Sequence, residues 1–180
     1  MYNFQLRDYT HKELREFTHH QLRSGGLVFV YDRTKNDVDE VRKLTEKYLD
    51  GTITEEERKK WMGDMKGALN ISDMKRIEGN IMVISKFFSV FPVGKTWNSS
   101  RDIPRESDFT RILGNIKKIR DAWFGLSNTP KTPARPLNTY QKWNDIEKIL
   151  HDFDYTYDRY INGFHYCGSE FYAGEGMGDL

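Results

Sequence analysis

Apolar residues recur at alternating steps of three and four along three stretches of the chain. The three sets are Met74, Ile77, Ile81, Ile84, Phe88 and Phe91; Phe109, Ile112, Ile116, Ile119, Trp123 and Leu126; and Trp143, Ile146, Leu150, Phe153, Tyr157, Tyr160 and Phe164. Such steps place side chains on one stripe of an α-helix. The pattern therefore predicts three helices with heptad-like seams, packed as a multi-helix bundle whose seams close within one chain or between chains.

The first two stretches also repeat each other in sequence. Residues 72–84 read SDMKRIEGNIMVI and residues 107–119 read SDFTRILGNIKKI, with eight identities at a separation of 35 positions. Ser72 and Ser107 are predicted as the N-caps, each with an aspartate in the first turn. A repeat of this kind indicates that one structural solution is used twice.

The repeated polar residues lie outside the apolar seam. With Met74 at heptad position a, Arg76 is at c, Gly79 at f and Asn80 at g; the second copy has Arg111, Gly114 and Asn115. A glycine inside a helix costs about 1 kcal/mol relative to alanine. Its presence in both copies predicts a second face that another helix or subunit approaches closely, with Arg and Asn supplying hydrogen bonds. A solvated face that was simply duplicated and a ligand site are the alternatives.

Other elements are predicted from capping and turn residues. Thr34 with Asp37, and Thr54 with Glu57, are capping boxes that predict helices ending near Asp50–Gly51 and near Met65. Asn138 with Gln141 opens the third seam helix in the same way. Thr10 with Glu13 predicts a helix over 10–23, and the β-prone run 27–31 predicts a short N-terminal strand or an extended segment.

Two segments differ in composition from the helices. Pro130, Pro133 and Pro136 recur at the three-residue period of polyproline II, which indicates a stiff spacer or a PxxP ligand. At the C-terminal end, aromatic residues alternate with glycines, which predicts an extended or hairpin tail whose rings need a surface in this chain or another. The tail aromatics that we expect at an interface are Phe164, Tyr166, Phe171 and Tyr172.

These patterns divide the chain into five expected regions. They are an N-terminal arm over 1–27 that is a candidate anchor, a helical domain with the duplicated motif over 28–126, a Pro-rich connector over 127–137, a long helix over 138–164 and an aromatic, glycine-rich tail over 165–180. The fold class is mainly α.

Composition narrows the classes of partner. The net charge of +1 from 28 basic and 27 acidic residues gives no footprint for nucleic acid, and no apolar run predicts a signal peptide or a membrane span. Cys167 is the single cysteine, which excludes an intrachain disulfide. We therefore expect the protein to be made and folded in a cytosol. Aromatic residues make up 14% of this polar chain, which favours a small helical core with a large contact surface.

Candidate chemistry is sparse, and we expect no catalytic, cofactor-binding or metal-binding residues. The motifs for serine hydrolases, phosphate loops and dinucleotide binding do not occur, and GKT in FPVGKTW lacks the upstream glycine of a phosphate loop. Asp152, Asp154 and Asp158 lack the glycine and the final glutamate of a calcium loop, so they are predicted to lie on a solvated helix face.

Five motifs in order carry a resemblance to a known group of proteins. They are DRTKNDVDEV, TITEEERKKW, GALNISDMKRIEGNI, W-x5-IPRESDFTRILGNI and PLNTYQKWNDIEKIL. Together they resemble a helical module of virion proteins from the tail and baseplate region of bacteriophages and prophages, mainly of Gram-positive and gut bacteria. The resemblance covers about residues 28–175 and brings no catalytic residues with it.

The resemblance implies a structural virion protein of a phage tail: a baseplate, tail-tip or fibre-attachment component made in the host bacterial cytoplasm. Its expected partners are other tail proteins and further copies of itself, as a trimer or a multiple of three, without nucleic acid or membrane. A cellular helical adaptor that binds through the PxxP connector or the aromatic tail is the alternative. A wall-degrading enzyme is a third hypothesis, for which the sequence offers no candidate acid or nucleophile.

Overall fold

The computed structural model describes residues 27–98 and 102–162, and five helices make up about 60% of these residues. They are α2 (Lys35–Leu49), α3 (Glu55–Met62), α4 (Ile71–Phe87), α5 (Glu106–Ala122) and α6 (Tyr140–Asn162). The prediction of a mainly helical bundle is confirmed. The chain divides into two units, and the unit described below is Val28–Tyr157. The predicted helix over 10–23 and the aromatic tail lie outside the described residues.

Of the two predicted alternatives for residues 27–31, a strand or an extended segment, the strand is not confirmed in the described residues. Residues 27–34 have no regular secondary structure, and the described ranges contain no strand with which they could pair. The backbone of this segment is bound by side chains instead: Asn80 donates to the carbonyl of Val28 and Glu147 accepts from the N–H of Val30. The β-prone residues therefore form a non-helical segment that lies along helices.

The three seams pack against one another inside a single chain. At the centre of each seam the side chains have no exposed surface; they are Met74, Ile77, Ile81 and Ile84 of α4, Ile112, Ile116 and Ile119 of α5, and Ile146 and Leu150 of α6. Phe153 and Trp143 of α6 are almost as deeply buried. Burial of each such side chain contributes on the order of 1.5–3 kcal/mol, which makes this seam the main source of stability.

The seams end earlier than the apolar spacing predicts. α4 ends at Phe87 and α5 at Ala122, so the last two residues of each predicted seam lie outside the helix. Ser89 has a positive φ of 53°, and Phe91 is 87% exposed. Pro92 explains part of the difference, because a residue before proline is disfavoured in the helical region.

The predicted N-caps of the repeated helices are also wrong. α4 and α5 begin two residues before the expected starts, with Asn70 and Arg105 as the capping positions. The aspartate of each repeat is the reason, because Asp73 accepts a hydrogen bond from the Asn70 N–H and Asp108 accepts one from the Arg105 N–H, both at 2.9 Å. These aspartates reach back from the third helical position and satisfy an otherwise free donor.

The two predicted capping boxes further upstream are confirmed, and they start the two helices of a hairpin. Thr34 and Asp37 open α2, and Thr54 and Glu57 open α3. Gly51, with a φ of 69°, lies in the turn between the helices. The Tyr48 ring stacks on Trp61 at 4.3 Å, yet Leu44 is the one buried residue in the two helices.

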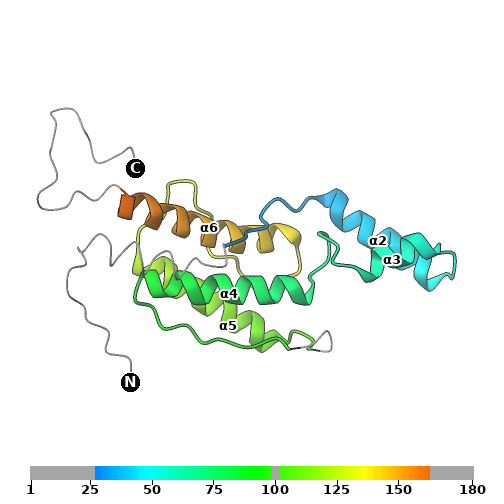
Figure 1. Cartoon of the computed structure of the whole chain (residues 1–180), viewed down its shortest axis with the longest axis horizontal. Coiled ribbons are helices and arrows are strands. Elements are labelled where there is room, and N and C mark those ends of the chain that lie inside the picture. Colours follow the sequence, from blue (N-terminus) through cyan, green and yellow to red (C-terminus); the bar gives the residue numbers. More distant parts are fainter. Residues whose placement is uncertain (1–26, 99–101, 163–180) are drawn as a thin grey trace, which may run out of the picture. The chain divides into compact units, whose positions relative to one another are not determined.

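The bundle helices α4, α5 and α6 lie side by side, and the chain enters each of them from the same end (Figure 1). Parallel helices cannot be joined by tight turns, because the chain must return along a helix of about 25 Å before the next one starts. The returning segments are called straps here: strap 1 is 27–34, strap 2 is 89–98 and strap 3 is 123–139. Each strap precedes one bundle helix, although α2 and α3 intervene between strap 1 and α4.

Side-chain contacts show that each strap runs antiparallel to its helix. Along strap 2, Phe91 and Val93 meet Lys118 and Asn115, and Lys95 then meets Asp108 near the start of α5. Strap 1 passes from Asn80 to Asp73 of α4 in the same sense. Strap 3 contains the prolines; Thr129 donates to Asp152 of α6, and the Leu137 carbonyl accepts from Trp143.

One glycine is required by a close approach of two backbones. A Cβ on Gly67, in the loop before α4, would lie 2.0 Å from the carbonyl oxygen of Asp37, whereas a Cβ on Gly79 or Gly114 would meet nothing within 4 Å. We expect Gly67→Ala to lower the free energy of unfolding by roughly 1–3 kcal/mol. Gly79→Ala and Gly114→Ala should each raise it by roughly 0.5–1 kcal/mol. Urea unfolding of the three variants measures this, and a neutral Gly67→Ala would contradict the close approach.

Candidate functional site

The repeated polar residues of α4 hold strap 1 in place. The Asn80 side chain is 4% exposed and donates to the Val28 carbonyl at 2.8 Å. Arg33, at the end of the strap, donates to Asp73 at 2.9 Å, and both groups are buried. A strap without regular secondary structure leaves backbone groups unpaired, so these side chains supply the partners that a sheet or helix would otherwise provide.

The second copy of the repeat binds strap 2 with equivalent side chains. Asn115 is 2% exposed; its oxygen accepts from the Val93 N–H at 3.0 Å and its amide donates to the Val93 carbonyl at 2.8 Å. Lys95 donates to Asp108 at 2.8 Å, in the place that Arg33 takes at Asp73. Arg111 adds a bond to the Val93 carbonyl at 3.0 Å.

The straps themselves are repeated in sequence, which extends the duplication beyond the helices. Residues 28–36 read VFVYDRTKN and residues 90–98 read VFPVGKTWN, with Val, Phe, Thr and Asn identical and Arg33 aligned with Lys95. The aligned basic residues bind the aligned aspartates, Asp73 and Asp108. The asparagine contacts differ by three positions along the strap. The repeated unit is therefore a strap followed by its helix.

Glu147 of α6 joins strap 1 and α4 in one buried network. It has no exposed surface and accepts from the Val30 N–H at 2.8 Å, from Arg33 at 2.9 Å and from Arg76 at 2.8 and 3.1 Å. Arg76 and Arg33 also share Asp73, so two arginines and two carboxylates neutralise one another. A matching ion pair joins Arg111 of α5 to Glu78 of α4.

Heptad positions relate these two interhelical pairs. In each pair an arginine at position c meets a glutamate at position e of a neighbouring helix: Arg76 with Glu147, and Arg111 with Glu78. The corresponding positions for the remaining pair of helices are Asp145 of α6 and Leu113 of α5. The third pair is therefore missing, and Asp145 is half-buried without a hydrogen-bond or ion-pair partner in the described part of the chain.

The pKa shifts follow from this pairing. Burial alone would raise the pKa of Asp108, but hydrogen bonds from Lys95 and from the Arg105 N–H outweigh it and hold the pKa below its ordinary value. Burial opposes the charge of Arg76, yet hydrogen bonds to Glu147 and Asp73 raise its pKa. Burial without a partner raises the pKa of Asp145.

Asp152 does not lie on a solvated face as predicted. It has no exposed surface, and it binds Lys148, the Thr129 hydroxyl of strap 3 at 2.8 Å and a ring nitrogen of His151 at 3.1 Å. Burial opposes its charge, but these hydrogen bonds keep its pKa low. The described residues contain no group of three His, Cys, Asp or Glu side chains placed to hold a metal ion.

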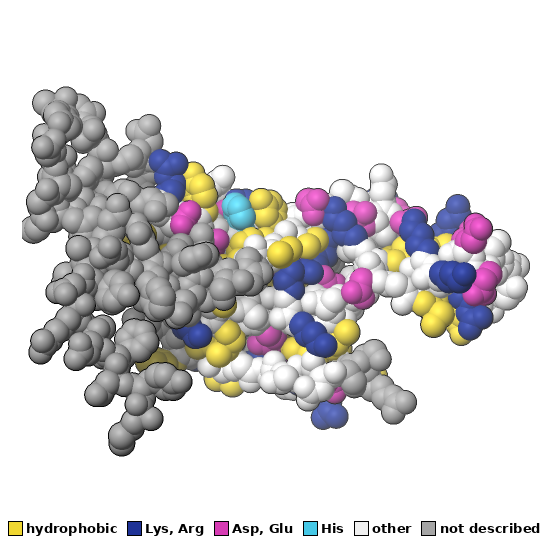
Figure 2. All heavy atoms as spheres, viewed as in Figure 1, with side chains coloured by type: hydrophobic (Ala, Val, Ile, Leu, Met, Phe, Trp, Pro, Cys, Tyr) yellow, Lys and Arg dark blue, Asp and Glu magenta, His cyan; other side chains and the backbone are white. Residues whose placement is uncertain are grey.

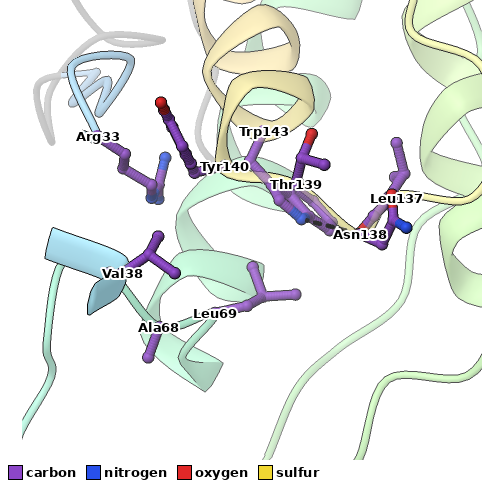
Figure 3. A pocket seen from close by; sticks show the side chains of 10 residues that line it. Arg33, Val38, Ala68, Leu69, Leu137, Asn138, Thr139, Tyr140 and Trp143 are labelled. Carbon is purple, nitrogen blue, oxygen red and sulfur yellow. Dashed lines mark hydrogen bonds between the residues drawn. The ribbon is translucent and has the colours of Figure 1, made fainter. Parts of the chain in front are cut away.

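A cavity of about 230 Å³ lies beside the ion network, between the start of α2, the loop before α4 and the start of α6 (Figure 3). Its walls are largely apolar, with Val38, Ala68, Leu69 and Leu137 among them. The Arg33 guanidinium at its edge is already bound to Asp73 and Glu147. The indole of Trp143 is bound to the Leu137 carbonyl. Of the two titratable side chains in the lining, Arg33 is therefore committed to the ion network, and Tyr140 is the other.

The residues predicted for an interface separate into three groups in the structure. Arg76, Asn80, Arg111 and Asn115 bind groups of the same chain, so the structure accounts for them without a neighbour. Gly79 and Gly114 are exposed with open space around them, and their contact with another subunit stays a prediction. The tail aromatics Phe164, Tyr166, Phe171 and Tyr172 lie outside the described residues.

Sequence reasoning missed the buried partners of the repeat. Glu147, Arg33 and Lys95 lie far from the motif in sequence, and only the aspartate within each repeat gave a local signal of a cation nearby. The similarity of the two straps was a signal that could have found Arg33 and Lys95. The two straps are 62 positions apart, whereas the two repeated helices are 35 positions apart, because α2 and α3 lie between strap 1 and α4.

Comparison with known proteins gives no relative: no family model, curated protein or solved structure matches this chain. Among the helices that the structure describes, none has the length and apolar character required to cross a membrane. The likeness to phage tail modules accordingly remains an expectation from the motifs.

The two asparagines should differ in their contribution to stability. Asn115→Ala leaves the Val93 N–H without its acceptor, whereas Asn80→Ala removes one bond to a carbonyl of Val28, a residue that is 58% exposed and can bind water. We expect Asn115→Ala to cost roughly 1–3 kcal/mol and Asn80→Ala clearly less. Urea unfolding measures both free energies. Equal losses would show that strap 2 is not held by this pair of bonds.

Asp145→Asn should stabilise the protein at neutral pH. The folded state raises the pKa of Asp145, so it binds the proton more tightly than the unfolded state does, and the carboxylate lowers stability above the folded pKa. The advantage of the variant should therefore be full at pH 7 and shrink as the pH falls toward the ordinary value of 3.8. Thermal unfolding of both proteins at pH 7 and at about pH 4 tests this; a difference that is independent of pH would contradict it.

Proposed function

We propose that this chain is a structural virion protein of a phage tail, a baseplate, tail-tip or fibre-attachment component that acts through subunit contacts. The motifs that resemble tail and baseplate modules support this assignment. The structure adds a reason to favour contact over catalysis. Its buried ionisable groups Arg33, Asp73, Glu147 and Asp152 are bound to one another or to the straps.

One observation carries the proposal: large apolar side chains are exposed, whereas the buried groups Arg33, Asp73, Glu147 and Asp152 are bound within the fold. Phe91 is 87% exposed, Ile103 78%, Leu49 76% and Met62 69%. Leu49 and Met62 both belong to the α2–α3 hairpin, and exposed apolar side chains gathered on one element can form a contact surface for another protein. A tail component that is enclosed by neighbouring subunits would bury these side chains on assembly.

The cellular adaptor receives less support from the connector. Strap 3 is bound along its length: Thr129 binds Asp152, and Arg135 binds Thr110 at 2.6 Å and Glu106 at 2.7 Å. A PxxP ligand would have to leave these contacts before it could enter an aromatic groove. The aromatic tail, which lies outside the described residues, stays open as an adaptor surface.

The proposal is tested by quantitative mass spectrometry of density-purified particles after prophage induction in the source strain. We expect the protein in intact particles, at a fixed ratio to the tail-tube protein that corresponds to a small multiple of three. The control is the soluble fraction of the same lysate, measured with the same peptides. Abundant protein in that fraction and none in the particles would contradict a virion role and favour an adaptor or an assembly factor that leaves.

A further inference from the structure

A continuous basic and apolar surface runs along α4, strap 2 and the neighbouring part of α5. Lys75, Gly79, Met82 and Lys86 follow one outer stripe of α4 at steps of four and three. A Cβ on Gly94 of strap 2 would lie 3.3 Å from the Met82 sulfur, so the strap lies directly against this stripe. We call the set Lys75, Met82, Lys86, Phe91, Val93 and Lys118 the α4 face. Figure 2 shows basic and hydrophobic side chains, with some acidic ones, in the region of α4.

The charges of the α4 face are not balanced by carboxylates. Within the described residues, Lys75 and Lys86 are exposed and form no ion pair, and the ammonium of Lys118 binds the Phe91 carbonyl at 3.4 Å. The nearest acidic residues of α4, Asp73 and Glu78, are buried and bound to arginines. An exposed strip of lysines around Phe91, Val93 and Met82 favours a partner that is both acidic and apolar.

The turn of the α2–α3 hairpin has the complementary character. Residues 46–57, called the hairpin tip here, contain five carboxylates against the single basic residue Lys47; they are Glu46, Asp50, Glu55, Glu56 and Glu57. Leu49 is 76% exposed and Tyr48 is 44% exposed in the same segment. Glu57 pairs with Lys47, and Glu55 pairs with Arg58 just beyond the tip, so Glu46, Asp50 and Glu56 are the tip carboxylates without an ion pair in the described residues. The tip therefore presents apolar side chains beside three unpaired carboxylates.

The hairpin is also an addition to the repeated unit. Between strap 2 and α5 the described residues contain no helix, whereas α2 and α3 lie between strap 1 and α4. The hairpin contributes little to the core, because Leu44 is the one buried residue in its two helices. An inserted element with few buried residues and an acidic, apolar tip is better suited to contact than to stabilising its own chain.

We propose that the hairpin tip of one copy docks on the α4 face of a second copy. The contact joins two different surfaces, so it is head-to-tail and leaves one free tip and one free α4 face in each pair, which can continue into a ring or a filament. The open space at Gly79 lies within the stripe that receives the tip. This inference rests on the proposed function in one respect, namely that the chain acts through contacts between subunits.

Sedimentation velocity of the purified full chain tests the contact. We expect association that increases with protein concentration and weakens between about 50 mM and 500 mM NaCl, because salt screens exposed charges. Glu46→Lys/Glu55→Lys/Glu56→Lys changes the formal charge of the tip from −4 to +2, and Lys75→Glu/Lys86→Glu changes that of the α4 face from +3 to −1. Each variant alone should weaken association about tenfold or more, since like charges then face each other.

Mixing the two reversed variants is the decisive arm, because the acidic α4 face of one then matches the basic tip of the other and association should return. Lys35→Glu/Lys59→Glu is the matched control: it reverses two exposed lysines of the hairpin outside the tip and should leave association unchanged.

A wild-type chain that stays monomeric in low salt, or association that neither reversal weakens, overturns the inference. Presence in phage particles is measured separately, so a monomeric virion protein would refute the contact alone, and a self-associating chain absent from particles would refute the virion role alone.

Discussion

The carboxylate of Glu147 is the group on which the arrangement of the described unit depends most. It has no exposed surface, and it receives bonds from strap 1, from Arg33 and from Arg76, so one side chain of α6 connects three separate parts of the sequence. A buried ion pair stabilises little relative to apolar packing, but removal of one partner leaves uncompensated charges at a cost of roughly 3–5 kcal/mol. With two arginines directed at it, Glu147 favours the arrangement in which strap 1 lies between α4 and α6.

The straps follow from the direction of the helices. Three parallel helices need connections that return along the bundle, and such connections expose backbone groups that neither helix nor sheet satisfies. Asn80 and Asn115 supply the missing partners because an amide can both donate and accept, as Asn115 does with the N–H and the carbonyl of Val93. This explains why each repeat has asparagine at position g next to the apolar seam: it lies under a strap and is buried, although it is not part of the seam.

Local patterns were sufficient to predict the helices and their central packing. The steps of three and four identified side chains that are fully buried, such as Ile81 and Ile116, and two capping boxes located the starts of α2 and α3. The ends of α4 and α5 were missed because apolar residues continue the same spacing into strap 2 and strap 3. Phe91 keeps the period of the seam and is exposed, so the spacing alone does not distinguish a helical seam residue from an apolar residue after the helix.

The partners of the repeated charges could not be predicted from one helix at a time. An arginine at position c is compatible with solvent, with a neighbouring helix or with another subunit, and the choice depends on the direction of the helices, which the heptad leaves open. Once the helices are parallel, Arg76 and Arg111 each face a glutamate at position e, and Asp145 is left opposite Leu113 by heptad position without a partner. Two of the three possible ion pairs between positions c and e of neighbouring helices are therefore present, and the third, between α6 and α5, is interrupted. That interruption, together with a hairpin inserted between strap 1 and α4 alone, makes the sides of the bundle unequal.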